Sequence, residues 1–166
     1  MFLPDYVFDR IWNISVKDIK NMGVEFLLLD VDNTLTGHNG QKLYSEVFGW
    51  VSMLKKAGIV AAIISNNKSA KVKEFASALE LQYVCRARKP LGRGFKILLN
   101  KLGCCKSRVA VIGDQIYTDI LGGNLVGIIT ILVQPLEREK EWLLRIKRFL
   151  ERPFLKKVKF EKTLRE

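Results

Sequence analysis

Two kinds of hydrophobic pattern alternate along the chain. Runs of strand length without regular polar positions occupy residues 24–31, 58–65, 81–85, 107–114 and 126–133. Such runs are typical of strands that are covered on both faces, as in a parallel sheet. Segments with hydrophobic residues at helical spacing lie between them, over 43–56, 69–79, 94–102 and 115–124. The alternation predicts an α/β fold, with a five-stranded parallel sheet and helices on both faces in a three-layer, Rossmann-like arrangement.

Both ends of the chain are expected to extend this core, which covers about 24–133, within a single domain of residues 1–166. Residues 1–23 are interpreted as a helical segment. Its first helix would present Tyr6, Val7, Ile11 and Trp12 on one face, and its second would begin at the capping box of Ser15 and Asp18. Residues 136–166 are predicted to form a basic amphipathic helix and a tail.

Charge and cysteine content narrow the class of protein. Lys and Arg number 28 and Asp and Glu number 17, which gives a net charge of +11. This excess favours an anionic partner, such as a membrane surface, a nucleic acid or a phosphorylated substrate. Three cysteines without a CxxC motif argue against a disulfide framework or a zinc site. The N-terminus lacks the pattern of a signal peptide, and the longest apolar run is too short to span a membrane, so a cytoplasmic location is expected.

Chemically reactive residues follow four of the predicted strands. They are Asp30 and Asp32 after the first, Ser65 and Asn66 after the second, Lys89 after the third, and Asp114 and Asp119 after the fourth. In open parallel sheets, ligands bind beyond the carboxyl ends of the strands. Ordinary loop polarity would explain any one of these residues, but it explains poorly why two pairs of acids converge from separate strands.

This set of side chains predicts magnesium-assisted phosphoryl transfer. Mg²⁺ prefers carboxylate oxygens and commonly joins them to a substrate phosphate. An aspartate can attack phosphorus, a lysine supplies a positive charge for phosphoryl oxygens, and a serine can donate a hydrogen bond to them. A receiver domain also gathers acids and a lysine at strand ends. However, its phosphorylated aspartate ends a middle strand, where this chain has Ser65.

Over residues 24–133 the motifs resemble those of the haloacid dehalogenase-like (HAD) phosphatases. The matching stretches are Asp30-Val-Asp32-Asn-Thr34, Ser65, Lys89-Pro90 and Gly113-Asp114-Gln115 with Thr118-Asp119. Many of these enzymes insert a cap domain after the first or second motif. Here each of those intervals holds one helix and one strand, so no cap domain is expected. The layout is similar to the YqeG-type group of subfamily IIIA, which is similar to phosphatidylglycerophosphatases.

The resemblance implies a role for each motif residue. Asp30 would be the nucleophile, and Asp32 would be the general acid and then the general base. Mg²⁺ would be held by Asp30, by the backbone carbonyl of Asp32 and by Asp114. Ser65 and Lys89 would bind the phosphoryl group, and Thr34 and Asn66 would orient the loops around it. Asp119 would support the metal shell.

The resemblance leaves the substrate open. Phosphatidylglycerophosphate is the leading expectation, because a capless site can receive the head group of a lipid. Between Arg145 and Glu166, nine basic residues stand against three acidic ones, which suggests peripheral contact with the inner face of the cell membrane. The alternatives are a phosphatase for a soluble nucleotide, sugar or protein phosphate, and a non-catalytic module that binds membrane or nucleic acid. Nucleic acid is the less favoured partner, since no binding motif for it is visible.

Overall fold

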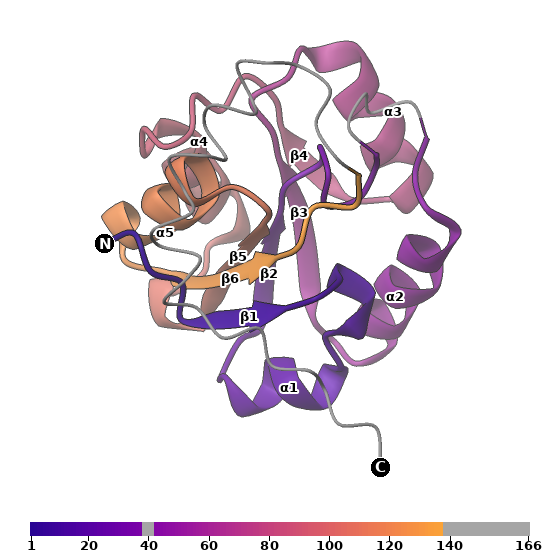
Figure 1. Ribbon diagram of the computed structural model, residues 1–166, viewed down its shortest axis with the longest axis horizontal. Coiled ribbons are helices and arrows are strands. Elements are labelled where there is room, and N and C mark those ends of the chain that lie inside the picture. Colours follow the sequence, from indigo (N-terminus) through magenta and orange to yellow (C-terminus); the bar gives the residue numbers. More distant parts are fainter. Residues whose placement is uncertain (38–41, 138–166) are drawn as a thin grey trace.

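The protein is built on a six-stranded, fully parallel sheet with strand order β1-β6-β5-β2-β3-β4. The computed structural model describes residues 1–37 and 42–137, and Figure 1 shows the sheet edge-on between its helices. The strands are β1 (Tyr6–Phe8), β2 (Phe26–Leu29), β3 (Val60–Ile64), β4 (Gln82–Val84), β5 (Val109–Gly113) and β6 (Ile129–Val133). The helices are α1 (Val16–Asn21), α2 (Ser45–Lys56), α3 (Ser69–Leu79), α4 (Arg93–Leu102) and α5 (Leu121–Val126).

Hydrophobic side chains of the central strands alternate between two cores, one on each face of the sheet. In β2, Leu27 and Leu29 belong to the core covered by α1, α2 and α3, whereas Leu28 belongs to the core covered by α4 and α5. Successive side chains of a strand point to opposite faces, so a strand covered on both sides must be apolar at every position. This explains the continuous apolar runs of the sequence and confirms the predicted α/β class with helices on both faces.

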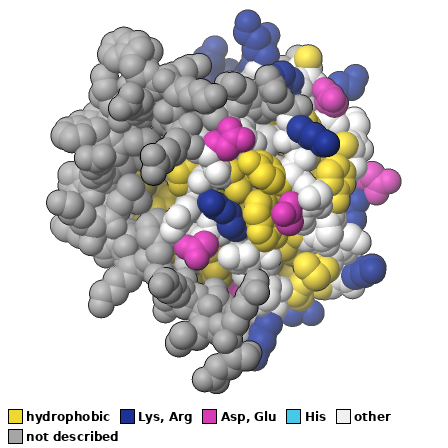
Figure 2. Space-filling view, turned by 45° about the vertical axis from the view of Figure 1, so that its right-hand side comes forward, with side chains coloured by type: hydrophobic (Ala, Val, Ile, Leu, Met, Phe, Trp, Pro, Cys, Tyr) yellow, Lys and Arg dark blue, Asp and Glu magenta, His cyan; other side chains and the backbone are white. Residues whose placement is uncertain are grey.

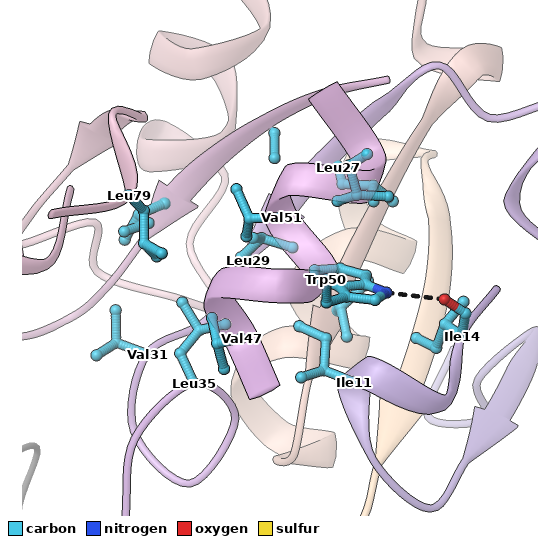
Figure 3. Close-up of a cluster of buried hydrophobic side chains, with 14 of the residues drawn as sticks. Ile11, Ile14, Leu27, Leu29, Val31, Leu35, Val47, Trp50, Val51 and Leu79 are labelled. Atoms are coloured by element: carbon cyan, nitrogen blue, oxygen red, sulfur yellow. Dashed lines mark hydrogen bonds between the residues drawn. The ribbon is translucent and has the colours of Figure 1, made fainter. Parts of the chain in front are cut away.

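The larger core is closed by the single tryptophan of helix α2. Trp50 is 2 % exposed, and its indole N–H donates a hydrogen bond of 2.8 Å to the backbone oxygen of Ile14 (Figure 3). The segment before α1 therefore packs onto α2 through both apolar contact and a satisfied polar group, which is what a buried indole requires. The N-terminal segment and the first crossover helix are thus fastened to each other on one face of the sheet.

The prediction for residues 6–12 was wrong. In place of an opening helix, Tyr6–Phe8 form the edge strand β1, which pairs in parallel with β6, and Ile11–Asn13 form a 3-10 helix. The sheet therefore has six strands instead of the five that were predicted. Asp5 fixes the start of β1, because its carboxylate accepts hydrogen bonds from the backbone N–H and the hydroxyl of Thr130. A strand of three residues exists only through its pairing with a segment about 125 positions away, which no local pattern encodes.

The other predicted elements are confirmed within the described residues. The Ser15–Asp18 capping box begins α1, α3 has its predicted bounds, and each of the five predicted strands is present with shorter ends. In the described residues between β2 and β4, only α2, α3 and β3 intervene, so no cap domain is inserted there. The basic helix and tail predicted for 136–166 lie outside the described residues from 138 onward.

The described surface mixes charge with exposed apolar area. On the face shown in Figure 2, most Lys and Arg side chains are separated from one another near the outline, and hydrophobic side chains lie at the centre between isolated acids. Large apolar side chains that are more than a third exposed include Phe48 and Met53 of α2 and Leu91 of the β4–α4 loop. Among residues 1–37 and 42–137, no helix has both the length and the apolar character needed to cross a bilayer.

Candidate active site

The carboxyl ends of β2, β3 and β5 bring the predicted motif residues to one edge of the sheet. Asp30 directly follows β2, Ser65 follows β3, and Asp114 follows β5. Because β2 pairs with both β3 and β5, these three ends are neighbours in space. The loop after the edge strand β4 brings Lys89 to the same place, where its ammonium contacts Asp30.

A tight turn after β2 presents Asp30 and Asp32. The carbonyl oxygen of Val31 accepts the backbone N–H of Leu35 at 2.9 Å and of Thr36 at 3.1 Å, so the chain folds around the residue between the two acids. Asn33 has φ of 56°, in the left-handed region. Asn is among the few non-glycine residues that adopt this conformation readily. The sequence Asp-Val-Asp-Asn is therefore suited to reverse the chain directly beyond a buried strand.

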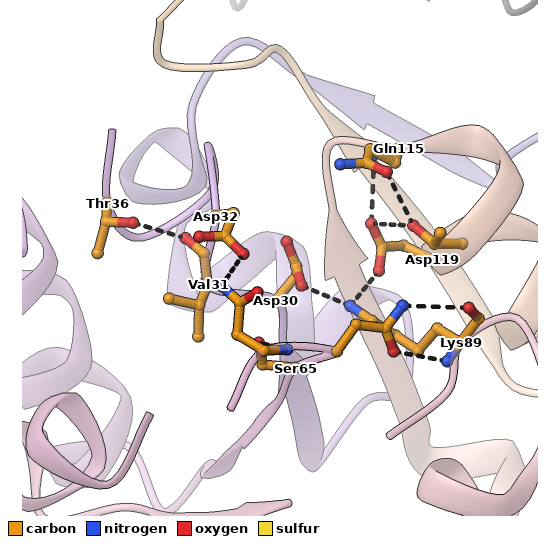
Figure 4. A network of polar contacts seen from close by, with 11 residues as sticks. Asp30, Val31, Asp32, Thr36, Ser65, Lys89, Gln115 and Asp119 are labelled. Carbon is orange, nitrogen blue, oxygen red and sulfur yellow. Dashed lines mark hydrogen bonds and ion pairs between the residues drawn. The ribbon is translucent and has the colours of Figure 1, made fainter. Parts of the chain in front are cut away.

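The ammonium group of Lys89 joins two acids in the interior of the site. Its Nζ atom lies 2.5 Å from a carboxylate oxygen of Asp30 and 2.5 Å from one of Asp119 (Figure 4). All three residues are buried, with Lys89 and Asp30 each 6 % exposed. Burial alone would lower the pKa of Lys89, but the charges of Asp119 and Asp30 outweigh it and raise that pKa. Lys89 therefore stays protonated and offers a fixed positive charge.

Asp119 is held by its own turn. It lies in a π-helical turn, Ile116–Ile120, a rare conformation that is frequent at functional sites. One of its oxygens contacts Lys89, and the other accepts the backbone N–H of Gln115 at 3.2 Å and the hydroxyl of Thr118 at 3.3 Å. The side chain also lies against Gly113, where an added Cβ would come within 2.6 Å of the Asp119 Cβ. Gly113 therefore leaves room for the side chain of Asp119.

Two consecutive asparagines after Ser65 hold separate parts of the site. The amide of Asn66 donates to the backbone oxygen of Lys89 at 3.1 Å, and its oxygen accepts the backbone N–H of Lys89 at 2.7 Å. The amide of Asn67 donates to the carboxylate of Asp32 at 2.6 Å, and its backbone N–H donates to the Ser65 hydroxyl at 3.1 Å. Asn66 therefore fixes the lysine loop, whereas Asn67 orients the second acid of the motif.

Three buried carboxylates form a set of donors that fits a divalent cation. Asp30, Asp114 and Asp119 each offer an oxygen, and these oxygens lie within 4.8 Å of one another. Burial raises the pKa of Asp30 well above its ordinary value, the charges of Asp119 and Asp114 raise it further, and Lys89 lowers it. One lysine does not compensate three acids. A hard cation that prefers oxygen ligands would complete the charge balance of this cluster.

The structure brings together four of the residues that the sequence singled out. Asp30, Lys89, Asp114 and Asp119 form the buried centre, with Ser65 also fully buried. The Asp32 side chain is turned toward Asn67, outside the three-carboxylate cluster. Thr34 is 1 % exposed, and its hydroxyl makes no hydrogen bond within the described part of the chain. Sequence reasoning missed Asn67 as a site residue, although its place directly after Ser65-Asn66 was a usable signal.

A buried acid cluster with one lysine, at the carboxyl edge of a parallel sheet, is typical of phosphoryl-transfer sites. A family model described as "HAD-hyrolase-like" matches residues 86–151. The chain is 35% identical to "Probable phosphatase YqeG" of Bacillus subtilis, over 95% of this chain and 92% of that protein. The chain therefore belongs to the haloacid dehalogenase-like (HAD) phosphatases, in their YqeG-type group, and is a phosphoric monoester hydrolase.

Other relatives and solved structures agree with this family. The chain is 31% identical to "Phosphatidylglycerophosphate phosphatase 1, chloroplastic/mitochondrial" of Arabidopsis thaliana, over 87% of this chain but only 47% of that protein. Two solved structures are 3-deoxy-D-manno-octulosonate 8-phosphate phosphatases. The cobalt-bound enzyme of Haemophilus influenzae has a TM-score of 0.54 at 16% identity and covers 82% of this chain and 92% of its own. The Moraxella catarrhalis enzyme, in complex with magnesium and phosphate, has a TM-score of 0.50 at 25% identity. It covers 61% of this chain and 65% of its own.

Proposed function

We propose that the protein is a magnesium-dependent phosphatase that works through an aspartyl-phosphate intermediate, and that its substrate is phosphatidylglycerophosphate. The observation that supports this mechanism is that the two acids after β2 have different surroundings. Asp30 lies in the buried cluster against Lys89, whereas the Asp32 carboxylate accepts a hydrogen bond from Asn67 and is not part of that cluster. This difference supports a role for Asp30 as the attacking carboxylate and for Asp32 as the group that moves a proton.

In the first step, a carboxylate oxygen of Asp30 attacks phosphorus, and the bond between phosphorus and the leaving alcohol oxygen breaks. The Asp32 carboxylic acid gives its proton to that oxygen. In the second step, water attacks the phosphorus of the aspartyl phosphate and gives a proton to Asp32, and the bond between phosphorus and Asp30 breaks. Asp32 is therefore acid and then base, and the enzyme returns to its starting state.

The remaining residues bind the phosphoryl group and offset its charge. Lys89 would supply a permanent positive charge, and the Ser65 hydroxyl, directly after β3, would donate a hydrogen bond to the phosphoryl group. Asp30, Asp114 and the backbone carbonyl of Asp32 would hold Mg²⁺, with Asp119 as a hydrogen-bond acceptor that supports them. When bound, the cation polarises the phosphoryl oxygens and stabilises the charge that develops on them. The magnesium ion in the Moraxella catarrhalis complex supports the choice of this metal.

The choice of a lipid substrate is supported by a relative and by the lack of an inserted cap domain in the described residues. The Arabidopsis thaliana relative is named for phosphatidylglycerophosphate. Within the described residues, no cap domain lies between β2 and β4, so the site has no inserted lid to enclose a small metabolite. A site without an inserted cap domain can receive a head group that remains attached to a bilayer. The enzyme would then work as a peripheral protein at the inner face of the membrane.

The test is phosphate release with and without Mg²⁺ from a panel of substrates. The panel holds phosphatidylglycerophosphate in vesicles, soluble sugar phosphates, nucleotides and p-nitrophenyl phosphate. We expect release that depends on Mg²⁺ and is fastest with the lipid. A faster soluble substrate would retain the phosphatase and reject the lipid assignment. Equal rates in the presence of a chelator would reject the magnesium-dependent mechanism.

Asn67 provides a separate test of the role of Asp32. We expect Asn67→Ala to slow hydrolysis of a simple alkyl phosphate by about tenfold, a part of the 10²- to 10⁴-fold that general acid catalysis contributes. Hydrolysis of p-nitrophenyl phosphate should change much less, because its leaving group is stable without a proton. The measurement is kcat for both substrates. Asn100→Ala, at an exposed position of α4, is the matched control. An equal loss with both substrates would mean that Asn67 acts only on the structure.

A further inference from the structure

The loop that carries Lys89 into the site also displays arginines on the surface. This loop, residues 86–93, follows β4 and ends with Arg93, the first residue of α4. Along it, Ala87 and Lys89 are buried, whereas Arg86 and Arg88 are exposed. Arg86 has φ of 49° and Arg88 has φ of 55°, so the chain takes left-handed conformations at both outward positions. This alternation turns one positive charge inward to the phosphate site and the others outward beside it.

The loop is held in this shape by contacts with the rest of the site. The backbone N–H groups of Arg86 and Ala87 donate to the carbonyls of Asn67 and Ser65, at 3.0 and 2.9 Å. The N–H of Leu91 donates to the Arg88 carbonyl at 2.8 Å, which closes a turn at the tip. At the base, a Cβ added to Gly94 would lie 2.5 Å from the Ala87 Cβ. The outward side chains are therefore presented from a fixed backbone, next to the residues that bind the phosphoryl group.

The exposed side chains of this loop have the character of a membrane-contact surface. Arg86, Arg88 and Arg93 are exposed, and none forms an ion pair or a side-chain hydrogen bond with another residue that the structure describes. Leu91, at the turn between them, is 64% exposed. Arginines without a partner among the described residues, around an exposed leucine, suit an anionic bilayer, because the charges attract lipid phosphates and the leucine enters the interface.

We infer that the loop of residues 86–93 is a docking surface for an anionic lipid bilayer and places the active site against the head groups. A substrate lipid can then present its phosphomonoester to Lys89 without leaving the bilayer. The consequence for turnover rests on the proposed lipid phosphatase activity, but binding to vesicles does not. The surface is distinct from the basic tail of the sequence, which lies beyond the described residues.

The test uses the full-length protein and two variants with the same loss of charge. The loop variant carries Arg86→Gln, Arg88→Gln and Arg93→Gln. The control variant carries Lys17→Gln, Lys20→Gln and Lys106→Gln, three exposed positions before β2 and β5 and hence at the opposite edge of the sheet. Sedimentation with vesicles of phosphatidylcholine, with and without about one-third phosphatidylglycerol, measures binding. Turnover of p-nitrophenyl phosphate checks that each variant keeps its fold.

We expect the loop variant to bind anionic vesicles up to about a hundredfold more weakly, since each of the three arginines near the surface contributes about fivefold. The control should lose no more than about threefold, since it loses only long-range attraction. Leu91→Ser should weaken vesicle binding by the same factor at low and at high salt. Equal losses in the loop and control variants, or loop-variant binding as tight as the wild type, would overturn the inference. So would a loop variant that loses binding to an oligonucleotide but keeps binding to vesicles.

The two proposals fail in different ways. If the wild type binds anionic vesicles through the loop but releases no phosphate from the lipid, the substrate assignment is wrong and the docking surface stands. The opposite outcome is that the wild type hydrolyses the lipid and the loop variant matches the wild-type rate both in vesicles and in detergent micelles. In that case the docking surface is rejected and the substrate assignment stands. The expected result is a loss of lipid turnover in vesicles that is much smaller in micelles.

Discussion

Replacing Asp30 with asparagine is expected to abolish turnover and at the same time to stabilise the metal-free protein. The loss of the nucleophile should lower kcat by about a thousandfold or more, because removing a nucleophile leaves only residual catalysis. The free energy of unfolding without Mg²⁺ should rise by about 0.5–2 kcal/mol, the usual gain when a strained functional residue is relieved. Phosphate release and thermal unfolding in the presence of a chelator measure the two effects.

The stabilising effect should depend on pH with a definite sign. Burial, reinforced by Asp119 and Asp114, raises the pKa of Asp30 in the folded state. Above the unfolded pKa of about 3.9, the folded state holds a proton that the unfolded state has lost, so stability falls as pH rises toward the raised value. In the Asp30→Asn variant the side chain does not titrate, so stability does not fall with pH in this way. Its advantage over the wild type should therefore be small near pH 4 and larger at neutral pH.

Two controls keep this prediction specific. Glu74→Gln makes the same carboxylate-to-amide change at an exposed position of α3, and it should alter neither turnover nor its dependence on Mg²⁺. Saturating Mg²⁺ should remove most of the difference in stability, because the cation compensates the charge of Asp30 in the wild type. A metal-free Asp30→Asn variant that is less stable than the wild type at neutral pH would contradict the view of Asp30 as a strained residue.

Lys89→Met is expected to have the opposite effect on stability. The change removes the cation that contacts Asp30 and Asp119, both buried, and leaves their charges uncompensated. Breaking a buried ion pair by removing one partner costs about 3–5 kcal/mol. Turnover should fall by at least about a hundredfold, since the phosphoryl group also loses its fixed positive charge. Urea unfolding, with and without Mg²⁺, and phosphate release are the measurements.

Magnesium should recover part of the stability of Lys89→Met. The cation would restore positive charge to the acid cluster, so the increase in unfolding free energy on adding Mg²⁺ should be larger in this variant than in the wild type. Lys96→Met, at an exposed position of α4, should change neither stability nor the response to Mg²⁺. If Lys89→Met unfolds at the same urea concentration as the wild type without metal, the contacts with Asp30 and Asp119 contribute nothing net to stability.

Local sequence determined most of the elements and the chemical identity of the site. Apolar runs without alternation indicated strands covered on both faces, and each such run is a strand of the sheet. The Asp30–Asp32 pair, Ser65, Lys89 and Asp114 were recognisable because reactive residues followed those runs directly. These features are local, since they depend on the spacing of residues within about ten positions and on the fixed geometry of a strand end.

Only the tertiary structure decided how these parts meet. The position of β2 between β3 and β5 sets Asp30 beside Asp114, and strand order depends on pairings between segments distant in the chain. The same reason explains why β1 was mistaken for a helix, because its three residues are stabilised by β6 alone among the strands. The two neighbouring asparagines likewise bond to different loops. Asn66 is hydrogen-bonded to Lys89, about 23 positions away, and Asn67 is hydrogen-bonded to Asp32, about 35 positions away. Spacing along the chain identifies such residues as polar loop positions, but their partners are set by how the sheet assembles.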